Sequence, residues 1–339
     1  MMSEYLSRIH WIQGSLPKAF LWPVLCYLQA LFGEGEKQDR GGMFYARKYV
    51  FDKSVRLYFD EEDSGRDDIC VSVSGGACDH IGQEAVFHLV KFLAKKQFKA
   101  SRLDCAVDDC NRSVSLETVK EAVFKCNFQG FLVVEPLEKY KLDGESLVKV
   151  SDGWCFGRRG SMGNGKYLRI YDKALESHGE NSAIRWECEF SGKRSRTVFN
   201  ELSSSLDQFH LATKIAALVG GCIDFRDRTG SGGHLDRMER LAWWELLLTE
   251  FGRIVTIPQR RSASMSKLFA WFTKQCGPSV AILRKYLIET NGGDQAAFFA
   301  WFDNLAKNCK NRLDNARLTM VREAVEAYAS RPVELDQYV

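Results

Sequence analysis

The segment Arg102-Leu-Asp104-Cys-Ala-Val-Asp108 alternates charged and apolar side chains. Successive side chains of a β-strand point to opposite faces of its sheet. The alternation therefore predicts a strand that places Arg102, Asp104 and Asp108 on one face. Leu103, Cys105 and Val107 would then lie on the other face, where we expect a hydrophobic core.

Two later segments repeat this alternation, Arg169-Ile-Tyr171-Asp-Lys173 and Arg185-Trp-Glu187-Cys-Glu189-Phe190. As strands, they would expose on one face the charged residues and the tyrosine, namely Arg169, Tyr171, Lys173, Arg185, Glu187 and Glu189. A merely solvated face would be richer in Thr, Ser and Lys. Carboxylates and arginines in register with one tyrosine have instead the composition of a metal-assisted phosphodiester site.

Several motifs, in the same order, resemble the Rep_trans family of rolling-circle replication initiators. They are Ser72-Val-Ser-Gly-Gly76, Arg102 to Asp109, Phe156-Gly-Arg-Arg-Gly-Ser161 with Leu168 to Lys173, Arg185 to Glu189, and Gly220 to Asp227. This family contains initiators of plasmids and filamentous phages, and relaxases of some mobile elements. The resemblance covers roughly residues 5–228. One departure from the family is His10. The family commonly has an acid in the first strand, so a role of that acid in binding metal or substrate does not carry over to this chain.

The pattern of strand-like and helix-like segments predicts an α+β fold. We expect an antiparallel sheet with helices on its apolar face and the active site on its polar face, the relaxase-like arrangement that the resemblance implies. This catalytic domain would span residues 1–228 and be followed by a Gly-rich linker at 229–235. Residues 236–339 show helical periodicity, which predicts an all-α C-terminal domain.

Composition limits the cellular setting more than the function. The net charge of +3 is mild for a nucleic-acid binder, so only local basic clusters could argue for DNA. The 11 cysteines are scattered without CxxC or metal-finger spacing, which predicts free thiols in a reducing cytoplasm. The apolar segment 19–32 contains Pro23 and is shorter than a membrane span, so we expect an inserted helix and no membrane partner.

The chemistry of the expected polar face suggests a role for each residue. Tyr171 is the candidate nucleophile, and because a free phenol has a pKa near ~10, Arg169 and Lys173 would supply activating positive charge. Oxygen ligands for Mg²⁺ or Mn²⁺ would come from Asp104, Asp108, Glu187 and Glu189. Contacts to DNA phosphates would come from Arg102, Arg158, Arg159 and Arg185.

Several assignments stay open at this point. Asp108 could instead end its strand, since Asp109 follows in an expected turn, and the preference for Glu187 over Glu189 is small. Arg158 and Arg159 could be solvated loop residues. The six histidines contain no His-x-His pair, so the histidine-ligated site of the commoner nicking enzymes is absent.

These residues favour a metal-dependent, origin-specific DNA nicking and rejoining enzyme. Attack by Tyr171 would leave a phosphotyrosine on the 5′ side and a free 3′ hydroxyl, which a host polymerase extends in the replication that the resemblance implies. The sequence has no nucleotide-binding signature, so strand separation would fall to a host helicase. A conjugative relaxase and a non-catalytic DNA-binding regulator are the alternatives, and a homodimer is left open. Basic candidates for origin recognition are 259–262 and 307–312.

Overall fold

The computed structural model describes residues 5–61, 66–160, 165–177, 179–228, 237–256, 265–309, 321, 322 and 325. The chain divides into two compact units, Met1–Gln259 and Arg260–Val339. We describe each unit by itself.

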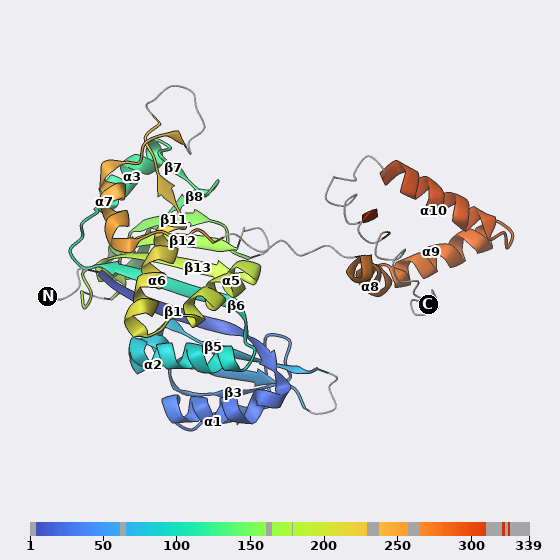
Figure 1. The fold of residues 1–339 in the computed structure, drawn as a ribbon, viewed down its shortest axis with the longest axis horizontal. Helices are drawn as coiled ribbons and strands as arrows, with labels where there is room; N and C mark the ends of the chain where they lie inside the picture. Colours follow the sequence, from blue (N-terminus) through green and yellow to red (C-terminus); the bar gives the residue numbers. More distant parts are fainter. Residues whose placement is uncertain are drawn as a thin grey trace. The chain divides into compact units, whose positions relative to one another are not determined.

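A large antiparallel sheet forms the centre of the first unit, as the sequence predicted (Figure 1). The described residues contribute 10 strands to it, in the order β2-β3-β4-β5-β1-β6-β13-β12-β11-β8. Their bounds are β1 (Tyr5–Pro17), β2 (Glu36–Gln38), β3 (Arg47–Val50), β4 (Arg56–Phe59), β5 (Asp68–Val73), β6 (Lys99–Asp109), β8 (Val134–Pro136), β11 (Gly153–Gly157), β12 (Lys166–Asp172) and β13 (Ile184–Ser191). Two small sheets pair β9 (Lys139–Asp143) with β10 (Ser146–Ser151) and β7 (Phe128–Gln129) with β14 (Asp224–Phe225).

Helices cover the apolar face of this sheet. Figure 1 shows α2 (Gly75–Lys95), α5 (Gly192–Ser203) and α6 (Gln208–Gly220) side by side across β1, β6 and β13. Beneath them lie the apolar residues of the alternating segments 102–108 and 185–190. They include Leu103, Val107, Trp186 and Phe190, all with 0% exposure. Burying each such side chain contributes roughly 1.5–3 kcal/mol, so the period-two pattern fixes which face of each strand turns inward.

Further helices of the first unit lie at the ends of strands. These are α1 (Leu21–Phe32), α3 (Leu116–Phe124), α4 (Lys173–Glu176) and α7 (Ala242–Phe251), with the 3-10 turns η1 (Lys18–Phe20) and η2 (Asp52–Ser54). The apolar segment after the first strand forms α1 and buries Val24, Leu25 and Leu28. In the part of the chain that is described, no helix combines the length and the apolar character needed to cross a bilayer.

Helix α7 belongs to the first unit, which places the unit boundary later than the predicted end at 228. Trp244 of α7 stacks on Trp186 with ring centroids 5.7 Å apart, and its Nε1 donates to Asp224 at 3.0 Å. Leu247 and Phe251 are also buried in the core. Sequence periodicity identified this helix but could not reveal that it packs against the large sheet. The expected linker at 229–235 lies outside the described residues.

In the second unit the described residues form α8 (Met265–Gln275), α9 (Gly277–Thr290) and α10 (Ala296–Cys309). A wholly helical C-terminal domain stays a prediction, because most of 310–339 lies outside the description. Of the basic segments expected to read an origin, 259–262 also lies outside it. Lys307 is described and pairs with Asp303 at 2.6 Å on the same helix.

The packing of α7 predicts where the chain can be shortened. A fragment of residues 1–259 should keep the near-ultraviolet circular dichroism and the cooperative thermal unfolding of the first unit. A fragment of residues 1–228 should lose both, because removing Trp244 alone costs about 3–5 kcal/mol out of a typical total of about 5–15 kcal/mol. Equal thermal unfolding of the two fragments would contradict this account of the boundary.

Candidate active site

Strand pairing aligns the polar face of the large sheet in rows that cross the strands. The Tyr171 row contains Asp108, Arg185 and Tyr171, from β6, β13 and β12. The Glu187 row contains Ala106, Glu187 and Arg169. The Glu189 row contains Trp11 of β1, Asp104, Glu189 and Tyr167. Because neighbouring strands lie about 4.8 Å apart, side chains of one row can touch one another.

The candidate nucleophile Tyr171 is buried in this face, with 4% exposure. Its hydroxyl donates a hydrogen bond to Glu187 Oε2 at 2.9 Å. Burial and the charge of Glu187 raise the pKa of Tyr171 far above its ordinary value, and Arg185 and Arg169 offset this only in part. The arginines lower this pKa as expected, but burial and the carboxylates outweigh them, so the phenol stays protonated.

Glu187 accepts the hydrogen bond of this hydroxyl. Besides Tyr171, it binds Arg169 Nη2 at 2.9 Å and His10 Nδ1 at 3.1 Å. Burial alone would raise the pKa of Glu187, but the bond from His10 and the charge of Arg169 hold it well below its usual range. The carboxylate is thus ionised, and it orients the phenol of Tyr171.

His10 lies in β1, the first strand, where the resemblance implies an acidic residue. The pairing of β1 with β6 shifts register between Ile9 and Trp11, so His10 sits in a β-bulge. Its ring contacts Glu187 and lies 3.6 Å from Asp79 Oδ2. Burial lowers the pKa of His10, but the bonds to Asp79 and Glu187 outweigh it and raise the pKa to about 9. At neutral pH His10 is therefore an imidazolium that links the two carboxylates.

The start of α2 is shaped to receive this histidine. A Cβ at Gly75 would lie 2.5 Å from the ring of His10, so no larger residue fits there. Gly82, with φ of 77°, breaks α2 after its first turns, which carry Asp79. Gln83 then uses its side-chain amide to bond the backbone N and O of Ile9, where the pairing of β1 with β5 has ended. Sequence reasoning missed Asp79, since nothing in a helix pattern marks it as a site residue.

Asp108 and Arg185 form a structural ion pair. Arg185 donates to both oxygens of Asp108, at 2.6 and 2.9 Å, and the side chains are 1% and 0% exposed. Arg8 at 3.0 Å and Asn181 at 3.3 Å complete the shell of Asp108. The structure therefore does not support Asp108 as a metal ligand or Arg185 as a DNA contact, because each is buried and saturated by its partners.

Asp104 and Glu189 face each other across β6 and β13. Arg102 donates to Asp104 at 2.9 and 2.6 Å, while Glu189 Oε2 lies 3.3 Å from Arg102 and 3.1 Å from Arg159. Burial raises the pKa of Asp104, Arg102 offsets this, and the charges of Glu187 and Glu189 add to the increase. Three carboxylates thus crowd this part of the face.

The donor chemistry of these carboxylates fits a hard divalent cation such as Mg²⁺ or Mn²⁺. Glu189 Oε2 supports this, since it is buried and its contacts with the guanidiniums lack hydrogen-bond geometry. Within the described ranges, however, no three His, Cys, Asp or Glu side chains converge closely enough to hold one ion. The metal site stays a prediction, with Asp104, Glu187 and Glu189 as its candidate ligands.

The remaining predicted residues lie toward the margins of the face. Strand β12 ends at Asp172, whose side chain accepts from Ala174 N and begins α4. Lys173 therefore lies at the start of α4 and pairs with Glu176 at 2.8 Å, and the Glu176 carboxylate also neighbours Tyr171. Arg158 and Arg159 follow β11 and are exposed.

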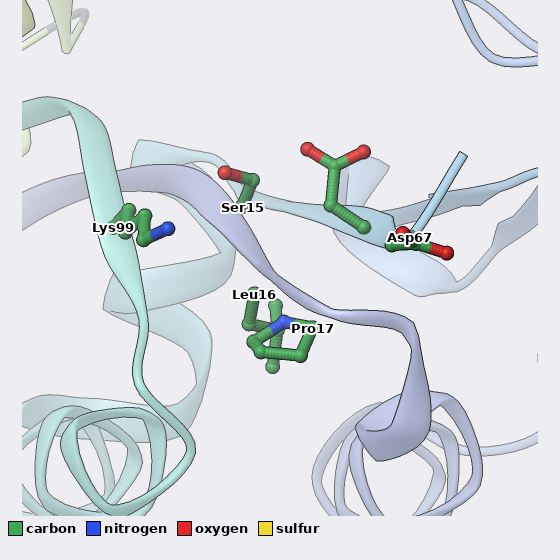
Figure 2. A pocket seen from close by; sticks show the side chains of 6 residues that line it. Ser15, Leu16, Pro17, Asp67 and Lys99 are labelled. Carbon is green, nitrogen blue, oxygen red and sulfur yellow. The ribbon is translucent and has the colours of Figure 1, made fainter. Parts of the chain in front are cut away.

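A pocket of about 360 Å³ lies elsewhere, near the other end of β1 (Figure 2). It is lined by Ser15, Leu16, Pro17, Asp67, Asp68 and Lys99. Leu16 is six residues from His10, or about 20 Å along an extended strand. None of the predicted site residues lines this pocket, and we assign it no role in the chemistry.

The family model Rep_trans, described as replication initiation factor, matches residues 98–295. The chain belongs to the Rep_trans family. The match includes β6, β12 and β13, so every site residue predicted from the sequence lies inside the Rep_trans match, whereas His10 and Asp79 lie outside it.

Among solved structures, the fold resembles the rolling circle replication initiator protein from Geobacillus stearothermophilus. The two chains are 18% identical, with 76% of this chain and 100% of that chain covered at a TM-score of 0.58. At this identity the likeness is one of fold. No curated protein matches the sequence.

The His10 contacts predict a pH dependence of stability. Because folding raises the pKa of His10 from 6.5 to about 9, its stabilisation is complete below pH 6.5 and is lost as the pH rises through 9. The free energy of unfolding of the wild type should therefore fall over this range more steeply than that of His10→Gln. Urea unfolding at several pH values measures the difference, and parallel pH profiles would contradict the assignment.

The buried ion pair of Asp108 and Arg185, in the same row as Tyr171, predicts that removing one partner lowers stability. Asp108→Asn should lower the free energy of unfolding by about 3–5 kcal/mol, because it leaves Arg185 buried without its partner. Asp104→Asn is the matched control and should cost less, since Arg102 is 29% exposed and keeps Glu189 as a partner. Equal losses in chemical denaturation would sink this distinction between the two aspartates.

Proposed function

We propose that the chain initiates rolling-circle replication by nicking and rejoining one DNA strand through a phosphotyrosine at Tyr171. The observation that carries this proposal is the 2.9 Å hydrogen bond from the Tyr171 hydroxyl to the ionised Glu187, at the centre of the polar face. Membership of the Rep_trans family, whose model covers both residues, supports it.

In the proposed reaction, the Tyr171 oxygen attacks a phosphorus of single-stranded DNA. A bond forms between this oxygen and phosphorus, and the bond from phosphorus to the 3′ oxygen breaks. The phenol proton passes through Glu187 to the leaving 3′ oxygen, which becomes a free hydroxyl, and Glu187 returns to its carboxylate form. Rejoining reverses these steps.

Arg169 provides positive charge next to this chemistry. Its guanidinium lies 5.6 Å from the Tyr171 ring centroid and binds Glu187 from the same row. As negative charge develops on the phosphate oxygens, a fixed guanidinium stabilises it. Mg²⁺ or Mn²⁺ held by Asp104, Glu187 and Glu189 would polarise the scissile phosphate when bound.

The partners that we propose follow from this reaction. The free 3′ hydroxyl is the end that a host polymerase extends, and a host helicase separates the strands ahead of it. The origin DNA would present an unpaired strand at the nick site.

One observation favours a second function. Tyr171 is only 4% exposed, as expected if the chain were a DNA-binding regulator that keeps the fold without nicking. The two functions differ in whether a covalent protein-DNA adduct forms.

Tyr171→Phe should abolish the covalent adduct on an origin oligonucleotide while leaving its binding nearly unchanged, because only the hydroxyl oxygen is removed. Denaturing gel electrophoresis with Mn²⁺ present detects the adduct, and fluorescence anisotropy measures binding. Tyr167→Phe is the matched control, since it removes a hydroxyl from the same strand and face.

We expect Tyr167→Phe to form the adduct as the wild type does. An adduct that survives in Tyr171→Phe would overturn the assignment of the nucleophile. The absence of any adduct with the wild type on the element's own origin would favour the regulator.

A further inference from the structure

Arginine side chains lie over aromatic rings at three places on the polar face. Arg102 is 4.4 Å from the ring centroid of Trp11, and Arg159 is 4.7 Å from that of Tyr167. The third pair, Arg169 with Tyr171, belongs to the chemistry proposed above. The first two pairs have no role in it.

Trp11 and Tyr167 are the outer members of the Glu189 row. Register pairs Trp11 with Asp104, Asp104 with Glu189, and Glu189 with Tyr167, so three strand spacings separate the rings. At about 4.8 Å for each spacing, the rings stand about 14 Å apart on the same face as Tyr171. Stacked nucleotides repeat every ~3.4 Å, so this row spans a few nucleotides.

Of the two guanidiniums over the rings, that of Arg159 can exchange partners, whereas that of Arg102 is held by two hydrogen bonds to Asp104. Arg102 and Arg159 both approach Glu189 Oε2, at 3.3 and 3.1 Å, without hydrogen-bond geometry. They are also 29% and 51% exposed, so solvent reaches both. A phosphate group would offer Arg159 a better acceptor than this shared oxygen.

The proposed reaction gives no role to the ring of Trp11 or to that of Tyr167. Trp11 Nε1 is buried and has no acceptor among the described residues, so no hydrogen bond of the indole fixes the ring. Burial raises the pKa of Tyr167 above its ordinary value, which keeps its hydroxyl protonated. Aromatic rings interleaved with arginines on an open groove are the usual means of holding unpaired nucleic acid.

We propose that Trp11 and Tyr167 form a stacking platform for the bases of single-stranded DNA next to the scissile phosphate, with Arg159 turning to the phosphates. This inference rests on the proposed function and names how the same face holds its substrate. The occupant is a single strand, because duplex bases keep their faces stacked on each other. Stacking tolerates any base, so the platform positions the strand without reading its sequence.

The platform can be tested by binding alone, without cleavage. The full chain carrying Tyr171→Phe is titrated into a labelled short oligothymidylate at fixed salt, and anisotropy gives the affinity. Adding Trp11→Leu or Tyr167→Leu should each weaken binding about tenfold, the usual loss when one stacking ring is removed. Trp11→Phe and Tyr167→Phe keep a ring and should change the affinity about twofold or less.

An oligonucleotide of abasic residues is the matched ligand, since it has the backbone without bases. On it the two leucine variants should bind as their parent does. Circular dichroism checks folding, and the more peripheral Tyr167→Leu keeps the test valid if Trp11→Leu does not fold.

Two results would overturn the platform. In the first, the leucine variants bind oligothymidylate as tightly as the phenylalanine variants do. In the second, the leucine variants lose as much affinity for the abasic strand as for oligothymidylate. If the adduct at Tyr171 still forms in that case, the proposed function stands without the platform. If the parent protein binds no single-stranded DNA at all, both fail.

Discussion

The need to pair buried charges governs the polar face of the sheet. An ionised group taken out of water costs several kcal/mol unless a partner of opposite charge and hydrogen bonds replace the solvent. Asp108 meets this need through Arg185, Glu187 through Arg169 and His10, and Asp104 through Arg102. Three of these pairs join different strands, and two of them, Asp108 with Arg185 and Glu187 with Arg169, link β6 to β13 and β13 to β12 in this register. The charge pattern therefore supports the strand order as well as the site.

The same pairing sets the reactivity of the site. Glu187 remains a carboxylate in spite of burial, while the pKa of its neighbour Tyr171 is raised. A nucleophile in this state is at rest and is oriented toward the group that would take its proton. An incoming DNA phosphate would bring negative charge to arginines that now serve carboxylates. Substrate binding and charge exchange on this face are thus one event in the proposed reaction.

Local periodicity predicted much of the fold, because a spacing of two residues decides which side chains share a face. It correctly grouped Asp104, Tyr171 and Glu187 on one side of the sheet. It could not show that Asp108 meets Arg185, since the two are 77 positions apart in the chain. Nor could it foresee that β12 stops at Asp172, because capping of the following helix ended the strand there. The packing of Trp244 onto Trp186 likewise depends on tertiary contact.

His10 illustrates a different limit. The sequence marked it only as a departure from the acid common in the family. Its contacts with Glu187 and Asp79 depend on a β-bulge and on a helix break at Gly82, neither of which has a periodic signal. A cation in place of an acid leaves fewer oxygens for a metal and gives Glu187 a fixed partner. The chain therefore places the charge arrangement of His10, Glu187 and Asp79 beside the sheet that the family model matches.

The central claim is that the Tyr171 oxygen becomes covalently bound to DNA, and the sequence allows this to be located directly. Trypsin cuts after Lys166, Arg169 and Lys173, so Tyr167 and Tyr171 fall in separate peptides. Trapped adduct is digested with trypsin and nuclease, and tandem mass spectrometry locates the nucleotide remnant. We expect the remnant on the Tyr171 oxygen of the peptide Ile170 to Lys173. A remnant on the peptide Tyr167 to Arg169, or on any other residue, would contradict the account.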